Sequence, residues 1–172
     1  MGNKNVIITN RTGKIIGEED FDLALKNKLI RKIVRMLVFN EQGELFVQKR
    51  GPTVKIWPHR WDSSAAGHVD VGETAPAAAR RELQEELGIF ARKLIKIADY
   101  YEEERENNIV VLKSFTTLYM APYSGKIKID ENEVVDGKWM RIEEIEKEMK
   151  LSPQQFSPGF VGAMEQYKKY QA

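Results

Sequence analysis

Short hydrophobic runs and turn residues alternate through the first 30 residues. Residues 6–9 and 14–16 are β-like runs on either side of residues 10–13, which end in glycine, so they predict a β-hairpin. In residues 19–28, Phe21 and Leu25 fall on one side of a helical pattern, which predicts a short helix. We expect this N-terminal extension, residues 1–30, to serve mainly in packing.

A second pair of hydrophobic runs, residues 33–39 and 44–49, flanks the turn-forming residues 40–43 and predicts another hairpin. The first run is apolar at nearly every position, which is typical of a central strand buried on both faces. The second run leads into Arg50, directly after Lys49. Such cations either lie at a solvated strand end or contact a phosphate group, and the sequence leaves both interpretations open.

The second half of the chain predicts more strands and two helices. Residues 93–101 and 109–119 are long β-patterned runs, and the acidic residues 102–108 between them suggest an exposed turn. Shorter runs at 126–129 and 134–140 follow, and then helical patterns at 142–150 and 160–170. Because the chain contains neither repeats nor a linker, we expect a single α/β domain, residues 1–172, with a mixed sheet between helices.

Residues 67–89 form the segment with the clearest chemical pattern. Thr74 suits a helix N-cap, and Gly88 suits a helix end in the left-handed conformation. Within the predicted helix, Glu82, Glu85 and Glu86 share one face, where their like charges repel. Crowded carboxylates without matching cations suit a hard divalent ion such as Mg²⁺. On spacing alone, a metal site and a plain acidic helix are equally acceptable.

The residues around this helix complete a longer pattern. Gly67 is followed after five residues by Glu73, and after seven more by the sequence Arg-Glu-Leu-Gln-Glu-Glu-Leu-Gly-Ile. This arrangement resembles the signature box of the Nudix hydrolases at every specified position. The resemblance implies a Nudix-like α/β/α sandwich with a mixed sheet, here preceded by the N-terminal hairpin. It also implies metal-dependent cleavage of a pyrophosphate bond in a nucleoside diphosphate linked to another group.

The resemblance assigns roles to individual residues. It implies Mg²⁺, or Mn²⁺ in its place, with these ligands: Gly67 through its carbonyl, Glu82, Glu85 and Glu86. Glu82 and Glu85 are the catalytic candidates within the segment. Outside it, Glu133 could act as the general base or could equally be an exposed turn residue. Arg81 is expected to hold Glu73 and to fix the loop against the helix.

The aromatic loop at residues 51–62 leads directly into Gly67. Its tryptophans, Trp57 and Trp61, either anchor the loop over the core or form a wall of the substrate site. His68 is either a hydrogen-bonded structural residue or a contact of the pyrophosphate. Together with Arg50, these residues are the substrate-binding candidates.

A rival function follows from the same residues. The opening hairpin, the tryptophan loop, Gly67–His68 and Trp139 resemble the branch that contains the isopentenyl-diphosphate isomerases. Those enzymes use a cysteine directly before the glycine–histidine pair, where this chain has Ala66. Their metal site gathers three histidines, whereas here only His68 stands at a matching place and Arg31 falls near another. We therefore expect hydrolysis. A non-catalytic nucleotide-binding module is the third alternative, and lost carboxylates, which would favour it, are not seen.

Composition excludes several other classes of protein. The chain has no cysteine and two histidines, which excludes disulfides and cysteine nucleophiles and argues against zinc. Hydrophobic residues make up 42% and charged residues 31%, as in ordinary globular proteins. The net charge of +1 gives no general attraction to nucleic acid. Without a membrane-spanning run or a leader-like N-terminus, the expected location is cytoplasmic. A homodimer is compatible with the sequence, but no feature demands one.

Overall fold

The computed structural model describes residues 4–172. Residues 1–3, which belong to the N-terminal segment that we expected to lack a leader, lie outside the described residues. Within residues 4–172, nine strands form one mixed sheet: β1 (Asn5–Thr9), β2 (Ile15–Asp20), β3 (Ile30–Phe39), β4 (Leu45–Arg50), β5 (Trp61–Asp62), β6 (Ala65–His68), β7 (Ile95–Glu106), β8 (Ile109–Pro122) and β9 (Val134–Met140). The helices are α1 (Phe21–Lys26), α2 (Ala75–Leu87), α3 (Ile142–Leu151) and α4 (Pro158–Gln171), with a 3₁₀ turn at Pro153–Gln155.

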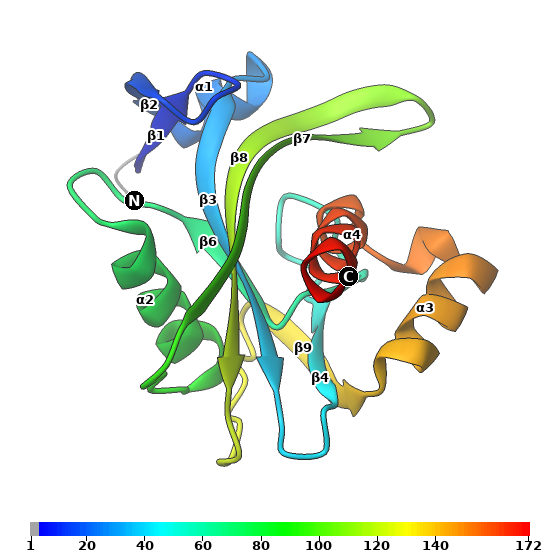
Figure 1. The fold of residues 1–172 in the computed structure, drawn as a ribbon. Helices are drawn as coiled ribbons and strands as arrows, with labels where there is room; N and C mark the ends of the chain where they lie inside the picture. Colours follow the sequence, from blue (N-terminus) through cyan, green and yellow to red (C-terminus); the bar gives the residue numbers. More distant parts are fainter. Residues whose placement is uncertain (1–3) are drawn as a thin grey trace.

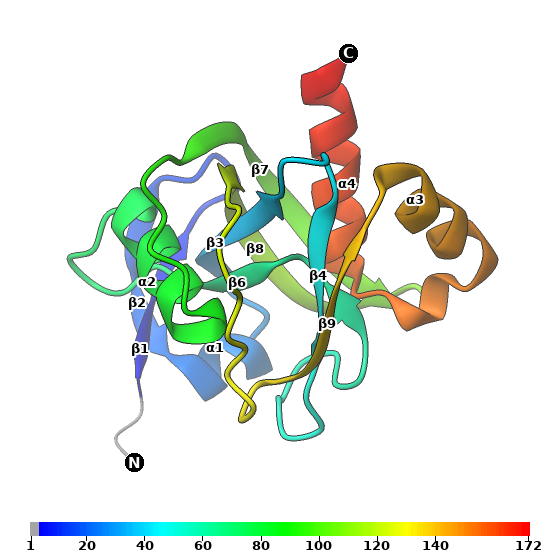
Figure 2. The same ribbon diagram turned by 90° about the horizontal axis from the view of Figure 1, so that it is seen from below.

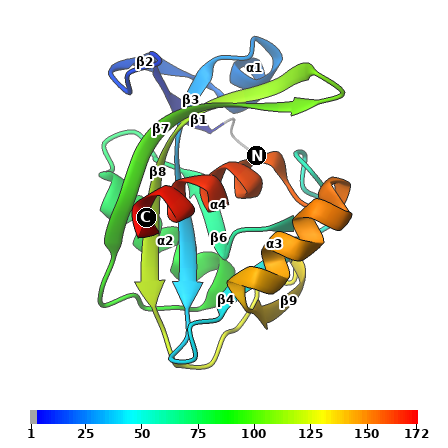
Figure 3. The ribbon, with the colours of Figure 1, turned by 45° about the vertical axis from the view of Figure 1, so that its right-hand side comes forward.

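Strand β3 is the centre of the sheet. It pairs in parallel with β8 along its whole length and antiparallel with β6, and it meets β1 near its start. On one face, Val34, Met36 and Val38 pack in a core cluster with α2, whereas Leu37 on the other face packs with α3 and α4. Helices α2 and α4 accordingly lie on opposite faces of the sheet (Figures 1 and 3). The predicted α/β fold with a mixed sheet and a central buried strand is confirmed.

The predicted second hairpin is wrong beyond its turn. Strands β3 and β4 pair only at Phe39 and Leu45 in the described sheet, and β4 then runs antiparallel to β9 (Figure 2). The reason is that β6, β1 and β8 already occupy the edges of β3. The separation of β3 from β4 places the segment that carries Gly67 between them.

The boundaries of two other predicted elements are also wrong. Residues 19 and 20 are not helical: they pair with β1 as the end of β2, and the Asp20 side chain caps α1. The acidic residues 102–106 are not an exposed turn, because they continue β7 in its ladder with β8. Only Asn107 and Asn108 make the turn, both with positive φ. The pairing of β7 with β8 thus carries Glu104 to a site with only 3% exposure.

The predicted strand at residues 126–129 is absent from the described structure. Instead, Lys128 donates its backbone N–H to the carbonyl of Leu87, and Asp130 donates to that of Glu86. The segment therefore satisfies carbonyls at the C-terminal end of α2, which have no partner within the helix. Within residues 4–172, none of the helices combines the length and the apolar character that crossing a membrane requires.

Candidate functional site

Helix α2 and the loop before it build one side of the candidate site. The predicted helix ends are confirmed: Thr74 Oγ1 accepts a hydrogen bond from the backbone N–H of Ala77, and Gly88 has a φ of 65°. Leu83 and Leu87 are fully buried and anchor the helix to the sheet. This orientation turns Glu82 and Glu86 toward β6.

Gly67 is required for the close approach of β6 to the helix. A Cβ atom at this position would lie 2.1 Å from Oε1 of Glu82, well inside van der Waals contact. Any other residue would force the Glu82 carboxylate to move. The glycine therefore leaves space for the carboxylate directly against the backbone of β6.

Arg81 ties the loop to the helix. Its Nε and Nη2 donate to the two carboxylate oxygens of Glu73 at 2.9 and 3.0 Å, and Nη2 also donates to the carbonyl of His68 at 2.9 Å. The hydrogen bonds from Arg81 lower the pKa of Glu73 and keep that carboxylate ionised. This paired geometry supports the predicted role of holding the loop, and that role stays a prediction.

Glu86 is a buried carboxylate whose hydrogen-bond donors are neutral. It is 6% exposed, and it accepts from Gln48 Nε2 at 2.7 Å and from the backbone N–H of Ala66 at 3.4 Å. Burial, followed by the charge of Glu82, raises the pKa of Glu86 well above its ordinary value. Burial also raises the pKa of Glu82 to about 7, although a hydrogen bond from Arg81 opposes the shift. Negative charge is therefore crowded here beyond what the neighbouring cation neutralises.

The other predicted carboxylates lie around this pair. The Glu85 side chain is 59% exposed, and Arg81 Nη1 lies 2.6 Å from Oε1 of Glu82 and 3.3 Å from Oε2 of Glu85. Glu133 is exposed, yet its charge contributes to the raised pKa of both Glu82 and Glu86, so it lies near them. In the part of the chain that the structure describes, no three acidic or histidine side chains are already gathered around one point.

The donor set nevertheless fits a divalent cation. Oxygen atoms from crowded carboxylates are the ligands that Mg²⁺ prefers. Burial raises the pKa of Glu82 and of Glu86, no ion pair within residues 4–172 gives Glu86 a counter-charge, and Gly67 leaves the backbone beside them uncovered. A bound cation would supply that counter-charge.

A small cavity of about 100 Å³ lies beside Gly67, against the face of β3 that carries Arg31 and Arg35. Arg35 forms a buried ion pair with Asp62, Nη1 to Oδ1 2.6 Å, and lies 3.6 Å from Glu104. The ion pairs with Arg35 and Arg50 lower the pKa of Asp62 despite its burial. Three arginines and two carboxylates therefore meet around this cavity.

The predicted substrate contacts fall in two places. Trp57 lines the cavity, and its Nε1 donates to Glu104 at 2.5 Å. Arg50 lines it too, and its Nη1 donates to Asp62 at 3.2 Å. His68 also lines it, with Nε2 at 2.8 Å from Nη1 of Arg31, and burial lowers its pKa to about 3. By contrast, Trp61 packs in the core cluster below α4, with the Lys138 ammonium 4.6 Å from its ring centroid. Its position favours packing over contact with substrate.

Gln48 and Arg35 were not predicted as site residues, and Arg31 was noted only as falling near a metal-binding histidine position of the isomerases. Gln48 carries no pattern of its own, because its partner Glu86 is 38 positions away. A signal was available for the arginines. They lie four residues apart with Ile33 midway, so the three side chains share one face of a strand that is otherwise mostly apolar. Two buried charges on one face of a central strand indicate a polar site on that face.

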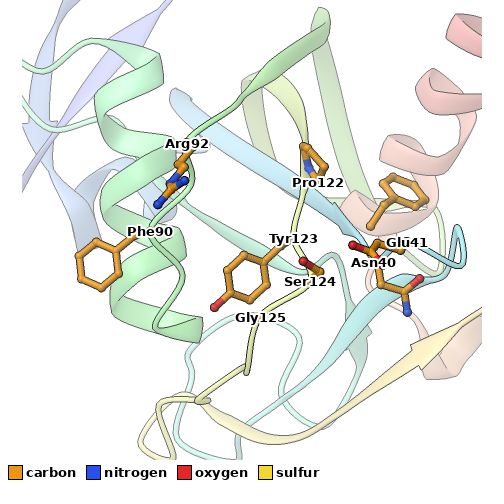
Figure 4. Close-up of a pocket in the computed structure, with 9 residues that line it drawn as sticks. Asn40, Glu41, Phe90, Arg92, Pro122, Tyr123, Ser124 and Gly125 are labelled. Carbon is orange, nitrogen blue, oxygen red and sulfur yellow. The ribbon is translucent and has the colours of Figure 1, made fainter.

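Two hollows, each about five times the volume of the cavity beside Gly67 or more, lie outside it. One, of about 510 Å³, is formed where β3 and β8 end, with Tyr123 between Phe90 and Arg92 on one side and Asn40 and Glu41 on the other (Figure 4). The other, of about 880 Å³, borders the exposed side of Glu85. Neither gathers the buried carboxylates and arginines that meet near Gly67.

Comparison with known proteins assigns a family. A family model described as NUDIX domain matches residues 29–160. The isopentenyl-diphosphate Delta-isomerase of Enterobacter sp. is 26% identical over 160 residues, covering 92% of this chain and 87% of that protein. The uncharacterized Nudix hydrolase lmo0368 of Listeria monocytogenes is 33% identical over 117 residues, covering 66% of this chain and 65% of the Listeria protein.

Solved structures show the same fold. The DR0079 protein of Deinococcus radiodurans superposes with a TM-score of 0.78 at 23% identity, covering 96% of this chain and 98% of that one. The Nudix domain of NrtR from Shewanella oneidensis, solved with ADP ribose, gives a TM-score of 0.65 at 16% identity, covering 90% of this chain and 100% of that one. Because the family model spans most of the chain and the complete 67–89 pattern lies within it, the protein belongs to the Nudix hydrolase family.

Proposed function

We propose that the protein is a metal-dependent pyrophosphohydrolase that cleaves a nucleoside diphosphate linked to another group. The observation that carries the proposal is Glu86, a buried carboxylate with neutral hydrogen-bond donors and a second carboxylate, Glu82, beside it. Such a pair destabilises the protein unless a cation joins it. Mg²⁺, or Mn²⁺, would be held by Glu82, Glu85, Glu86 and the carbonyl of Gly67.

The bound cation would offset charge on the pyrophosphate and make the attacking water more acidic. The remaining chemistry falls to residues of the chain. Glu82, whose carboxylate lies against the backbone of β6 at Gly67, is the proposed acceptor of the proton of that water. Glu133 is the alternative base. Arg81 positions the loop through Glu73 and through the carbonyl of His68.

Isomerisation of isopentenyl diphosphate is the second candidate, favoured by the isomerase-like relatives that align with 92% of the chain. Residue 66 argues against it. Ala66 lines the cavity, and its methyl group cannot supply the proton that an alkene needs. The nucleotide-type ligands named for structural neighbours, ADP ribose for NrtR and Ap4A for a hydrolase of C. elegans, support a nucleotide substrate here.

The test is a panel containing ADP-ribose, diadenosine tetraphosphate, nucleoside triphosphates and isopentenyl diphosphate, each incubated with and without Mg²⁺. We expect Mg²⁺-dependent cleavage of a nucleotide pyrophosphate, detected by ³¹P NMR, and no shift of the alkene in isopentenyl diphosphate. Formation of dimethylallyl diphosphate would support the isomerase instead. Metal-dependent binding without any cleavage would support a binding module.

A further inference from the structure

Arg31 is a buried cation with unused hydrogen-bond donors. It is 3% exposed on β3, and its Nη1 contacts a neutral partner, Nε2 of His68, at 2.8 Å. Its Nε is buried without a hydrogen-bond partner in residues 4–172, and the ion pairs of this described part do not include Arg31. A buried guanidinium in this state is costly: burial lowers the pKa of Arg31 to about 10, and the charges of Glu104 and Glu102, neither of which pairs with it, offset the cost of desolvation only in part.

The acceptors around the same cavity are already engaged. Asp62 accepts from Arg35 at 2.6 Å and from Arg50 at 3.2 Å, and it also receives the backbone N–H of Ser63 at 2.7 Å. Glu104 accepts from Trp57 at 2.5 Å and lies 3.6 Å from Arg35. The unused capacity therefore consists of donors, which selects an acceptor-rich, anionic ligand.

The dimensions of the cavity select a compact group. A volume of about 100 Å³ is several times the roughly 10–15 Å³ that one water needs, so a phosphate group fits and a nucleoside does not. Ile33, Ile56 and Leu112 form apolar walls that restrict the space further. Gly67 belongs both to this cavity and to the contact with Glu82, so the backbone of β6 at Gly67 is a wall that the two sites share.

We propose that the Arg31 cavity is a second phosphate subsite, which receives a terminal phosphate of the substrate while the cleaved pyrophosphate lies at the α2 carboxylates. The proposal rests on the proposed function and specifies its substrate class. Substrates that end in a free phosphate, such as nucleoside triphosphates, are preferred over diphosphates esterified at both ends, such as ADP-ribose. Arg31 is the specificity-determining residue.

Binding of inorganic pyrophosphate to the metal-stripped protein tests the subsite without any turnover. Isothermal titration should show binding to the wild type and at least about tenfold weaker binding to Arg31→Met, because a charge-assisted contact is lost. Arg92→Met is the matched control, since Arg92 lines the separate hollow of Figure 4, and it should bind like the wild type. Undiminished binding to Arg31→Met, or no binding to the wild type, would overturn the proposal.

Thermal unfolding separates this role from a structural one. Without ligand, Arg31→Met should have a melting temperature no lower than the wild type, because an unpaired buried charge is removed. If this variant does not fold, Arg31→Lys decides the matter: it keeps the charge but loses the planar donors, so pyrophosphate binding should weaken several-fold. Wild-type affinity in Arg31→Lys would then contradict the proposal.

Kinetics distinguish failure of the subsite from failure of the proposed function. Arg31→Met should raise KM for a nucleoside triphosphate about tenfold and change KM for ADP-ribose by less than about twofold. Equal effects on both substrates would refute the phosphate subsite but would not affect the proposed hydrolysis. Absence of Mg²⁺-dependent turnover in the wild type would refute the proposed function, whereas the metal-free titration would still report on Arg31.

Discussion

The two sides of Gly67 carry unneutralised charge of opposite sign. On the α2 side, Glu82 and Glu86 are crowded together, Arg81 pairs with Glu82 but not with Glu86, and the pKa values of both carboxylates are raised. On the cavity side, Arg31 is a buried cation whose nearest hydrogen-bond partner is a neutral histidine. The first arrangement suits a divalent cation, and the second suits a phosphate group.

Neighbouring residues show what a purely structural charge looks like in this fold. Arg35 lies on the same face of β3 as Arg31, and it is paired with Asp62 at 2.6 Å. Arg81 is likewise paired with Glu73 through two hydrogen bonds. Paired charges hold elements together, whereas unpaired ones indicate where ligands bind. The predictions that follow test this distinction.

The largest effect is expected for Glu86→Gln. The substitution keeps the shape of the side chain and its place beside Gln48 but removes the charge that a cation needs, so turnover should fall roughly 10³-fold. The melting temperature should not fall, because a strained buried charge is lost. Steady-state kinetics and thermal unfolding measure both quantities. Glu165→Gln, at an exposed position of α4, serves as the control and should match the wild type.

Next in size is the stability lost in Arg35→Met. Breaking this buried ion pair from one side leaves Asp62 with the longer contact to Arg50 and costs about 3 kcal/mol, or about 10 °C in a protein of this size. Arg31→Met, four residues earlier on the same face of β3, is the matched comparison and should show no such loss. Equal destabilisation by the two variants would refute the distinction between paired and unpaired arginines.

A moderate effect is expected from pH. The pKa of Glu82 in the folded protein is about 7, above its ordinary value of 4.5, so its contribution to stability is complete below pH 4.5 and is lost as pH rises through 7. The metal-stripped protein should therefore melt about 5 °C lower at pH 8 than at pH 5. Addition of Mg²⁺ at pH 8 should raise the melting temperature back to its value at pH 5.

Glu82→Gln should reduce this pH slope without abolishing it, because burial also raises the pKa of Glu86 and of Glu102, and both act in the same direction. Melting curves of the two proteins at several pH values provide the measurement. A slope unchanged by the substitution would mean that Glu82 is not the titrating group.

The smallest effect is expected for Arg81→Lys. Lysine keeps the charge but cannot donate simultaneously to Glu73 and to the carbonyl of His68, so the loop that carries Gly67 is held less firmly. The Mg²⁺ concentration for half-maximal activity should rise about tenfold, with little change in maximal rate at saturating metal. A fall in maximal rate alone would instead place Arg81 in contact with the reacting group.

Local patterns were sufficient for part of the structure. The helix ends at Thr74 and Gly88, the buried β3 strand and the α/β class follow from capping chemistry and hydrophobic periodicity, which act over a few residues. The partner of β4 could not be predicted in the same way, because β9 lies about 90 positions further along the chain. The assumed hairpin with β3 failed since the edges of β3 were already occupied.

Local sequence patterns likewise predicted only part of the candidate site. The carboxylates of α2 are contiguous in sequence, so their pattern could be recognised directly. The Arg31 cavity is assembled from strands β3 to β8 and the tryptophan loop, so its charges can be interpreted only once the strand pairing is known. Glu104 is an example: the acidic run suggested an exposed turn, whereas the β7–β8 ladder buries Glu104 beside Arg35.

The crowded carboxylates of α2, Glu82 and Glu86, are proposed to bind a divalent cation. Electron paramagnetic resonance of Mn²⁺ titrated into the protein at pH 8 tests it most directly, since binding is observed without any substrate. We predict that the wild type and Glu165→Gln bind Mn²⁺ that excess Mg²⁺ displaces, and that Glu86→Gln loses this binding. Equal Mn²⁺ binding by Glu86→Gln and the wild type would contradict the account.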